Sequence, residues 1–510
     1  MGGDRAKTAR RKNLLVRGAN DLIALGLVAY LLAAPGVTVL RDLGDPHLDG
    51  PGIPRAAVRL FDDLTPRFEE WASERVAAGR AAELGTDDIS GTEWPLFGSV
   101  FYLWSVEAMQ RAWDGGQRFS ELPPKERAHG AIDAAVELVV DPRHATWVKD
   151  HWGDDHLHRE NAFYRMLVIS AITAQIELTG ESRHRPLLRD QVDSLSREID
   201  AAPFGLIDDY PDQCYPTDVL AAIAAIRRAD RVLGTDHSEF ARRARRGFEG
   251  GLVDPLGLPP YMADSKRGEP DGGSRGCSNS YACIFSAEIW PDRAAQWYSA
   301  YERHFWQARL SAVGFREYPE STADDFFDGD VDAGPVLAGF GFAACAFGAG
   351  AARVAGRFDH AYPLAAEMIA ISWPLPDGRL ALPRLLSNSV DAPYLGEAAI
   401  LFTLTRQPAE GIEVRRGGEV PGLTVILVAC YFGLAALAII RIVYKHLRWR
   451  RRELADLPPV TPIEIAVWVS LVGAGLAVAA FASAGLSALL LLCMAQLLPR
   501  RAKARSAHPV

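Results

Sequence analysis

The densest group of chemically active side chains is the segment DDYPDQCYPTD, residues 208–218. It places four acids, two tyrosines and one thiol within eleven residues. Turn formation and helix capping account for the acids, the prolines and the threonine. They do not account for the tyrosines and the thiol as well, so we expect catalytic or binding residues here. The candidates are Asp209, Asp218 and Cys214 for proton transfer, with Tyr210 and Tyr215 for substrate binding.

A second candidate acid is Glu93, which precedes Trp94 and Pro95 in the segment EWPLFG. A carboxyl group against an aromatic wall has a raised pKa and then serves as a general acid near neutral pH. The alternative is structural, because Pro95 favours the first turn of a helix, where Glu93 would stabilise the helix dipole. Glu93 is therefore a catalytic candidate, and Trp94 is a candidate for substrate binding.

The segment HLHRENAFYR contributes a candidate base, His158, because an imidazole changes charge near neutral pH. Asn161 and Tyr164 lie three residues apart, on one face of a predicted helix, and are candidates for substrate binding. The alternative is that both are structural, with their polar groups hydrogen-bonded inside the core. His156 and His158 would share a metal only in an extended chain, and the spacing supplies no third ligand. We therefore expect no metal site.

The segment RGCSNSY opens another predicted helix and supplies four candidates for substrate binding: Arg275, Cys277, Ser278 and Tyr281. A thiol at a helix N-terminus beside an arginine tends toward the thiolate. The alternatives for Cys277 are an inert buried thiol or a disulfide to Cys214. Arg275 has an alternative role as well, which is to neutralise nearby acids.

The segment DDFFDGDVDAGP adds Asp330 and Asp332 as candidates for substrate binding. Its Asp-x-Asp spacing is found in calcium loops, but the glycine position and the distal glutamate of an EF-hand are missing. No motif in the chain points to a cofactor, so we expect none.

Helices must position these segments. Between residues 55 and 410, apolar residues recur every three or four positions, as in a helix, and not at every second position, as in a strand. Counted along the chain, the odd-numbered predicted helices carry many charged residues, whereas the even-numbered ones are apolar on every face or rich in small residues. Alternating outer and inner helices predict an all-α fold, a closed six-hairpin (α/α)6 barrel, whose loops into the inner helices converge on one mouth. The twelve predicted helices are 55–78, 94–112, 125–140, 160–179, 186–200, 216–233, 237–248, 278–288, 292–308, 334–355, 359–371 and 392–405.

The charge pattern places this barrel outside a membrane. The chain has 510 residues and a formal net charge of −9, yet both of its ends are basic and adjoin long apolar runs. Basic flanks stay in the cytoplasm, so the pattern predicts both termini there, with four membrane crossings. The resulting order is a basic N-terminus 1–20, a span 21–41, the extracytoplasmic barrel 42–420, a span 421–440, a basic cytoplasmic loop 441–462, a membrane hairpin 463–498 and a basic tail 499–510.

Two alternatives bear on this topology. The run at residues 22–40 has the composition of a cleaved signal peptide, although it is long for one and contains Pro35 and Gly36. Basic blocks on an acidic body also occur in nucleic-acid-binding proteins. Here both blocks abut apolar runs, and no nucleic-acid motif is present. The expected partners are the membrane and a small-molecule or glycan substrate, not nucleic acid.

The order of five short motifs resembles the linalool dehydratase/isomerase family. They are EWPLFG with a following Phe-Tyr, REN-x-x-YR, YP-x-D, RG-x-S-x-S-Y and D-x-D-x-GP, and they span roughly residues 55–405. The resemblance implies an α/α barrel that hydrates, dehydrates and isomerises monoterpene alcohols without a cofactor, using Asp, His, Tyr and two Cys in the barrel mouth. Where the family has its cysteine pair, this chain has Asp208 or Asp209 and Thr217, with Cys214 between them.

Three functions remain open from the sequence. The first is a lyase or isomerase acting on a hydroxylated, partly apolar substrate by acid and base catalysis. The second is a membrane-anchored glycosidase or polysaccharide lyase acting on envelope glycans with paired carboxylates. The third is a non-catalytic envelope protein. A deep apolar pocket favours the first function, an open polar groove the second, and a mouth plugged by its own loops the third.

Overall fold

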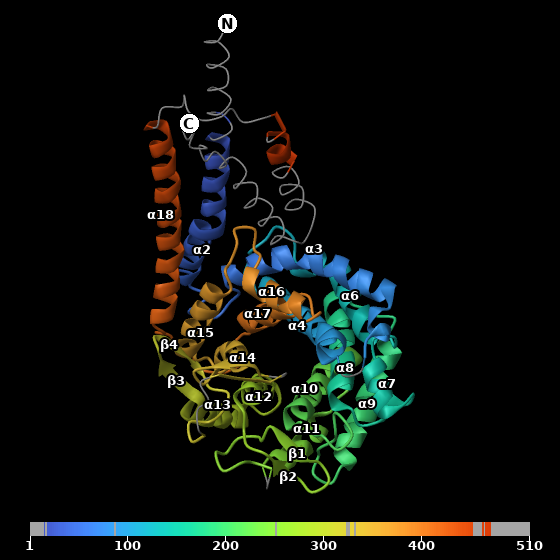
Figure 1. Cartoon of the computed structure of the whole chain (residues 1–510). Helices are drawn as coiled ribbons and strands as arrows, with labels where there is room; N and C mark the ends of the chain where they lie inside the picture. The colour runs from blue at the N-terminus through green and yellow to red at the C-terminus, as the bar shows by residue number, and fades with distance from the viewer. Residues whose placement is uncertain are drawn as a thin grey trace, which may run out of the picture. The chain divides into compact units, whose positions relative to one another are not determined.

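The structure of the protein is a computed structural model, and Figure 1 shows the whole chain. It describes residues 15, 18–85, 88–249, 252–322, 327–330, 333–451, 462–463 and 465–470. The chain divides into two compact units. One unit is Thr38–Val428, here called the body; the other combines Met1–Val37 with Ala429–Val510.

The body is mostly helical, which confirms the predicted class. Two predicted helices, 55–78 and 216–233, have the predicted bounds. The helices of the body are α3 (Arg55–Ala78), α4 (Ile89–Asp114), α5 (Pro124–Arg127), α6 (His129–Val140), α7 (Thr146–Trp152), α8 (Ala162–Thr179), α9 (Arg185–Ala201), α10 (Pro216–Leu233), α11 (Ser238–Ala244), α12 (Gly276–Ile289), α13 (Pro291–Phe305), α14 (Phe342–Val354), α15 (Phe358–Ile371), α16 (Ala381–Ser389) and α17 (Leu395–Thr405).

Six of these helices follow one another in contact: α4 packs on α8, α8 on α10, α10 on α12, α12 on α14, α14 on α17, and α17 back on α4 (Figure 1). Their composition explains their place, because apolar or small side chains on every face suit a helix surrounded by others. In α14, Gly348 lies so close to the ring of Phe315 that an added Cβ would be 2.4 Å from it. The small residues of this helix therefore permit close packing.

The remaining helices cover this inner set. α9 shows the reason, because its apolar residues Leu188, Val192, Leu195 and Ile199 recur every three or four positions and are all buried. The charged residues of the helix lie on its other side, which faces the solvent. α6, α13 and α15 pack against inner helices in the same way, and α3 packs against α6 and α17.

Short strands interrupt the helical pattern in the second half of the body, which the sequence did not predict. They form three small antiparallel sheets: β1 (Met262–Asp264) with β2 (Glu269–Asp271), β3 (Trp306–Arg309) with β4 (Ala312–Phe315), and β5 (Phe327–Asp330) with β6 (Gly334–Leu337) and β7 (Phe340–Gly341). The predicted helix 334–355 was wrong in its first eight residues. Gly334 and Gly339 have positive φ angles there, and Pro335 lacks an amide hydrogen, so a helix begins only at Phe342.

Within the part of the chain that the structure describes, two helices are long and apolar enough to cross a membrane, Gly18–Leu43 and Gly422–Leu447. The first ends in α2 (Ala34–Leu43), and the second lies in α18 (Gly422–Arg451). They agree with the predicted spans 21–41 and 421–440. The predicted hairpin 463–498 lies largely outside the described residues, as do most of the basic N-terminus, the cytoplasmic loop and the tail.

Candidate functional site

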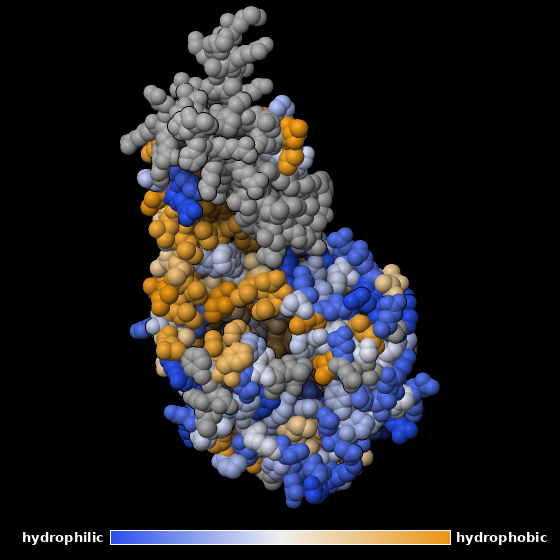
Figure 2. Space-filling model, in the orientation of Figure 1, coloured by the Kyte–Doolittle hydropathy of each residue, from blue (hydrophilic) through white to orange (hydrophobic). Residues whose placement is uncertain are grey.

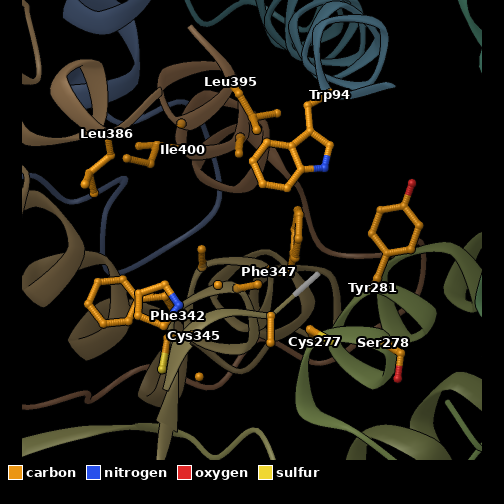
Figure 3. Close-up of a pocket in the computed structure, with 18 of the residues that line it drawn as sticks. Trp94, Cys277, Ser278, Tyr281, Phe342, Cys345, Phe347, Leu386, Leu395 and Ile400 are labelled. Carbon is orange, nitrogen blue, oxygen red and sulfur yellow. The ribbon is translucent and has the colours of Figure 1, made fainter. Parts of the chain in front are cut away.

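The body contains a cavity of about 1270 Å³, lined by inner helices, by α15 and α16, and by strands β3, β4, β6 and β7. Figure 2 shows a hollow in the face of the body, with apolar side chains gathered along the side where α15 and α16 lie in Figure 1. In Figure 3, Trp94, Tyr281, Cys277 and Ser278 lie on one side of the cavity, and Leu386, Ile400, Phe342 and Cys345 on the other. The cavity thus joins a polar end to a larger apolar part.

The polar end carries most of the predicted site. Most of its residues lie in the first two turns of inner helices or in the loops before them. The residues of this end are Glu93, Trp94, His151, Asp209, Tyr210, Tyr215, Thr217, Asp218, Cys277, Ser278 and Tyr281.

Asp209 is buried between the starts of two inner helices, with 3% of its surface exposed. One carboxylate oxygen accepts a hydrogen bond from the amide of Phe163, in the first turn of α8, at 2.7 Å. The other accepts from the amide of Tyr215, directly before α10, at 3.1 Å. Burial, followed by the nearby charge of Asp218, raises the pKa of Asp209 well above its usual value. The side chain therefore holds the two helix starts, and its burial favours the protonated form.

Two hydroxyl groups at the polar end have no hydrogen-bond partner among the described residues. Thr217 is 5% exposed and precedes Asp218 in the first turn of α10, and its Oγ1 is unpartnered. The phenol of Tyr281, on α12, is also 5% exposed and unpartnered. Buried polar groups are normally hydrogen-bonded, and an unsatisfied one costs about 1–3 kcal/mol. Thr217 and Tyr281 both line the cavity, so a ligand whose polar group reaches these hydroxyls would satisfy them.

Glu93 lies inside α4, not at its start. The helix begins at Ile89, where the side chain of Asp88 accepts a hydrogen bond from the amide of Gly91. Pro95 cannot donate to the carbonyl of Gly91, which instead accepts a hydrogen bond from the buried guanidinium of Arg75. This donor from α3 allows proline within the helix, and Glu93 consequently projects into the cavity wall from the second turn.

The Glu93 carboxylate accepts a hydrogen bond from the phenol of Tyr210. Burial raises the pKa of Tyr210, and the charge of Glu93 raises it further, so the phenol remains protonated as the donor. The ring of His151 meets the ring of Tyr210 edge-on, with 5.1 Å between centroids. His151, on the short helix α7, also lines the cavity. It is a titratable residue of the site that the sequence analysis missed.

Cys277 belongs to a buried polar cluster beside the cavity. Its thiol donates to a carboxylate oxygen of Glu317 at 3.0 Å, and its amide donates to the other oxygen at 3.2 Å. Arg275 donates to the same carboxylate at 2.8 Å, and its guanidinium lies 4.3 Å from the ring centroid of Tyr261. Glu317 therefore stands between the arginine and the thiol. Cys277 and Cys214 are both free thiols, so the alternative of a disulfide between them is wrong.

The apolar part of the cavity contains one carboxylic acid that the sequence analysis did not single out. Glu367 on α15 is 8% exposed and accepts a hydrogen bond from the amide of Val313 at 3.1 Å. Burial raises its pKa to about 7. Nearby, burial raises the pKa of Cys345 to about 12, so this thiol stays protonated. The only sequence signal for Glu367 was a single acid within the apolar stretch AAEMIAI.

Four of the predicted site residues lie away from the cavity. His158 is half exposed and hydrogen-bonds Asp155 and Asp190 at the surface. Cys214 is completely buried, and burial raises the pKa of its thiol far above the usual range. The amide of Asn161 donates to backbone carbonyls before α8, and the phenol of Tyr164 donates to the carbonyl of Val139 at 3.2 Å.

Three other predicted residues are not among the described residues that line the cavity. Arg275 donates to Glu317, which in turn accepts from the lining residue Cys277. Asp330 ends strand β5, and Asp332 lies outside the described residues. Among the described residues, no group of three or more His, Cys, Asp or Glu side chains is arranged to hold a metal ion.

Comparison with known proteins gives no assignment. No family model matches the chain, and no curated protein matches it. A function must therefore be inferred from the residues that line the cavity.

Proposed function

We propose that the protein is a membrane-anchored enzyme of the linalool dehydratase/isomerase type, with a six-hairpin (α/α)6 barrel. The barrel is supported by the contacts of the inner helices, in which α17 packs back on α4. The family is supported by the order of its five motifs, four of which lie wholly in described residues near the start of an inner helix. Basic flanks on apolar helices support a multi-pass topology with both termini in the cytoplasm.

The reaction we propose is acid- and base-catalysed elimination of water from an alcohol, or its reversal and isomerisation. The observation that carries the proposal is a single cavity joining buried acids and unpartnered hydroxyls to a larger apolar part. Such a cavity suits a substrate with one hydroxyl group and a hydrocarbon body. A glycan would leave most of the apolar part empty.

The residues at the polar end divide the reaction between them. Asp209, whose pKa is raised by burial, donates a proton to the departing hydroxyl. The carbon–oxygen bond breaks, and water leaves with its electron pair. A second carboxylate, Asp218 or Glu93, removes a proton from the adjacent carbon, and the electrons of that bond form the double bond. His158 and Cys214, which lie away from the cavity, have no part in this scheme.

Tyr281 and Thr217 position the hydroxyl group of the substrate. Two donors and acceptors aimed at one oxygen fix which carbon faces the base. Replacing Tyr281 with Phe removes one of them without changing the shape of the ring. Because it also removes an unsatisfied buried hydroxyl, the folded protein should be as stable as the wild type or slightly more so.

The test is to incubate the purified full chain with a panel of terpenols and to analyse the products by gas chromatography. Wild type should form an alkene or a rearranged alcohol. Glu93→Gln and Asp218→Asn should each lower the rate about 100-fold or more if the residue transfers a proton. Asp208→Asn is the matched control, since Asp208 is a buried neighbour that does not line the cavity. Full activity of both carboxylate variants would overturn the mechanism.

The second candidate is a glycan-active enzyme, and one observation favours it. Trp94, Tyr215 and Tyr261 surround the acidic end and present rings on which a sugar could stack. The same variants tested on envelope glycan fragments would decide the question. Release of reducing sugars by wild type, lost in Glu93→Gln, would replace the alcohol proposal.

A further inference from the structure

The cavity is larger than a monoterpene alcohol requires. Pockets for drug-sized ligands usually occupy roughly 300–1,000 Å³, whereas this cavity has about 1270 Å³. We define the apolar arm as the lining residues Phe342, Phe347, Met368, Leu386, Ile400 and Leu423. They come from α14, α15, α16, α17 and α18, so the arm is a continuous apolar wall and not a single side pocket.

The arm opens onto large apolar side chains that are exposed to solvent. We define the apolar lip as Leu310, Leu337, Phe342, Leu386 and Val390, all of which line the cavity. Leu310 is 70% exposed, Leu386 51% and Phe342 43%. Apolar side chains gathered at the mouth of a ligand cavity mark a surface that meets a membrane or an apolar ligand.

The lip is connected to a membrane span through the chain itself. Leu423, in the arm, is the second residue of α18, whose segment Gly422–Leu447 is apolar enough to cross a membrane. Its amide donates to the carbonyl of Ser311 at 2.7 Å, and Ser311 follows Leu310 in the β3–β4 turn. The turn that carries the most exposed residue of the lip is therefore fastened to the first turn of that span.

The charges at the other end of the cavity select the head group. Asp218 and Glu93 line the same end as Tyr281 and Thr217. Two carboxylates there disfavour a phosphate and suit an uncharged alcohol. Among the described lining residues, the arginine is Arg309, which ends β3 beside Leu310. A phosphate would be placed there, at the lip, rather than at the acids.

We propose that the substrate is a long-chain lipid alcohol that enters from the bilayer across the apolar lip. Its chain lies along the apolar arm, and its hydroxyl group hydrogen-bonds Tyr281 and Thr217. This inference rests on the proposed function for the fate of the hydroxyl, but the binding and the route of entry are tested without turnover.

The first experiment measures binding to the full chain in detergent micelles, with labelled geranylgeraniol as the long alcohol and geraniol as the short one. Ala399→Trp fills the arm, since Ala399 is a half-buried lining residue on α17. It should lower the affinity for geranylgeraniol relative to geraniol at least 10-fold. The control is Ala295→Trp, because Ala295 is exposed on α13 and does not line the cavity. An unchanged ratio in Ala399→Trp would show that the chain does not occupy the arm.

The second experiment measures transfer of geranylgeraniol from phosphatidylcholine vesicles to the protein in bilayer discs. Leu310→Asp and Leu386→Asp place charge on the lip and should slow the transfer at least 10-fold. Uptake of geraniol, which travels through water, should be unchanged. Leu122→Asp is the control, since Leu122 is 55% exposed and does not line the cavity. Equal slowing by Leu122→Asp, or none by either lip variant, would overturn entry across the lip.

Competition with geranylgeranyl phosphate tests the head group, and the alcohol should bind at least 10-fold more tightly. Tighter binding of the phosphate would refute the assignment of an uncharged alcohol. Binding of geranylgeraniol as described, without product, would overturn the proposed function and leave this inference standing. Conversion of geraniol without any binding of geranylgeraniol would do the opposite.

Discussion

Replacing Asp209 with Asn separates the structural role of this carboxylate from its role as an acid. Each of its oxygens accepts one backbone hydrogen bond, from Phe163 at 2.7 Å and from Tyr215 at 3.1 Å. An asparagine has one acceptor oxygen, so its amino group must face the other N–H. A buried donor left without an acceptor costs about 1–3 kcal/mol. We expect Asp209→Asn to lower the free energy of unfolding of the body by that amount.

Asp208→Asn is the matched control for stability as well as for activity. Asp208 is also buried, but its side chain accepts one backbone hydrogen bond, from Asp212 at 3.0 Å. The oxygen of an asparagine can keep that bond, so the loss should be about 0.5 kcal/mol or less. The assay is urea unfolding of the full chain in detergent, followed by tryptophan fluorescence.

The pH dependence of the difference gives a second readout. Burial raises the pKa of Asp209, so the folded protein keeps a proton that the unfolded chain has released. This stabilisation is present below the unfolded value of about 3.9 and is lost as the pH rises through the raised value. Asparagine does not titrate, so the advantage of wild type over Asp209→Asn should shrink as the pH rises above about 3.9 and through the raised pKa. An advantage that stays constant or grows with pH would refute this account of Asp209.

Three further predictions concern the fold around the cavity. Arg75→Met leaves the carbonyl of Gly91 without a donor and should lower the free energy of unfolding by about 1–3 kcal/mol in the same urea assay. Gly276→Ala places a Cβ 2.0 Å from a backbone oxygen and should lower the melting temperature, whereas Gly273→Ala, which meets nothing within 4 Å, should not. Glu367→Gln removes a group whose pKa is raised to about 7, so wild type should lose stability relative to the variant as the pH rises through about 7.

The sequence predicted the helices where local signals agree with the tertiary structure. α10 has its bounds because Pro216 occupies the first turn and Gly234 ends the helix with a positive φ. Pro95 gives the same local signal as Pro216 but lies inside α4, since the donor that replaces its amide comes from α3. The spacing of apolar residues within α4 cannot predict a hydrogen bond from another helix.

The site was predictable to the extent that chain position fixes side-chain direction. Asp209 and Tyr281 lie at the cavity because they stand in or near the starts of inner helices. His158 stands in a similar place in the chain, but it pairs with exposed acids and turns to the surface. Glu367 comes from an outer helix, α15, where the parity of the helices gave no reason to look.

The contact between Gly52 and Gln407 has a consequence for the order of events during synthesis. The amide of Gly52 donates to the side chain of Gln407 at 2.7 Å, across 355 residues, and the buried guanidinium of Arg353 joins the carbonyls of Gly52 and Arg406. At roughly 5–20 residues per second, a ribosome needs about 20–70 s to travel between these positions. For that interval the first helices must remain open without their last neighbour. Nascent chains stalled before Leu395 should therefore stay sensitive to protease and be held by chaperones, whereas chains extended past Gln407 should become resistant.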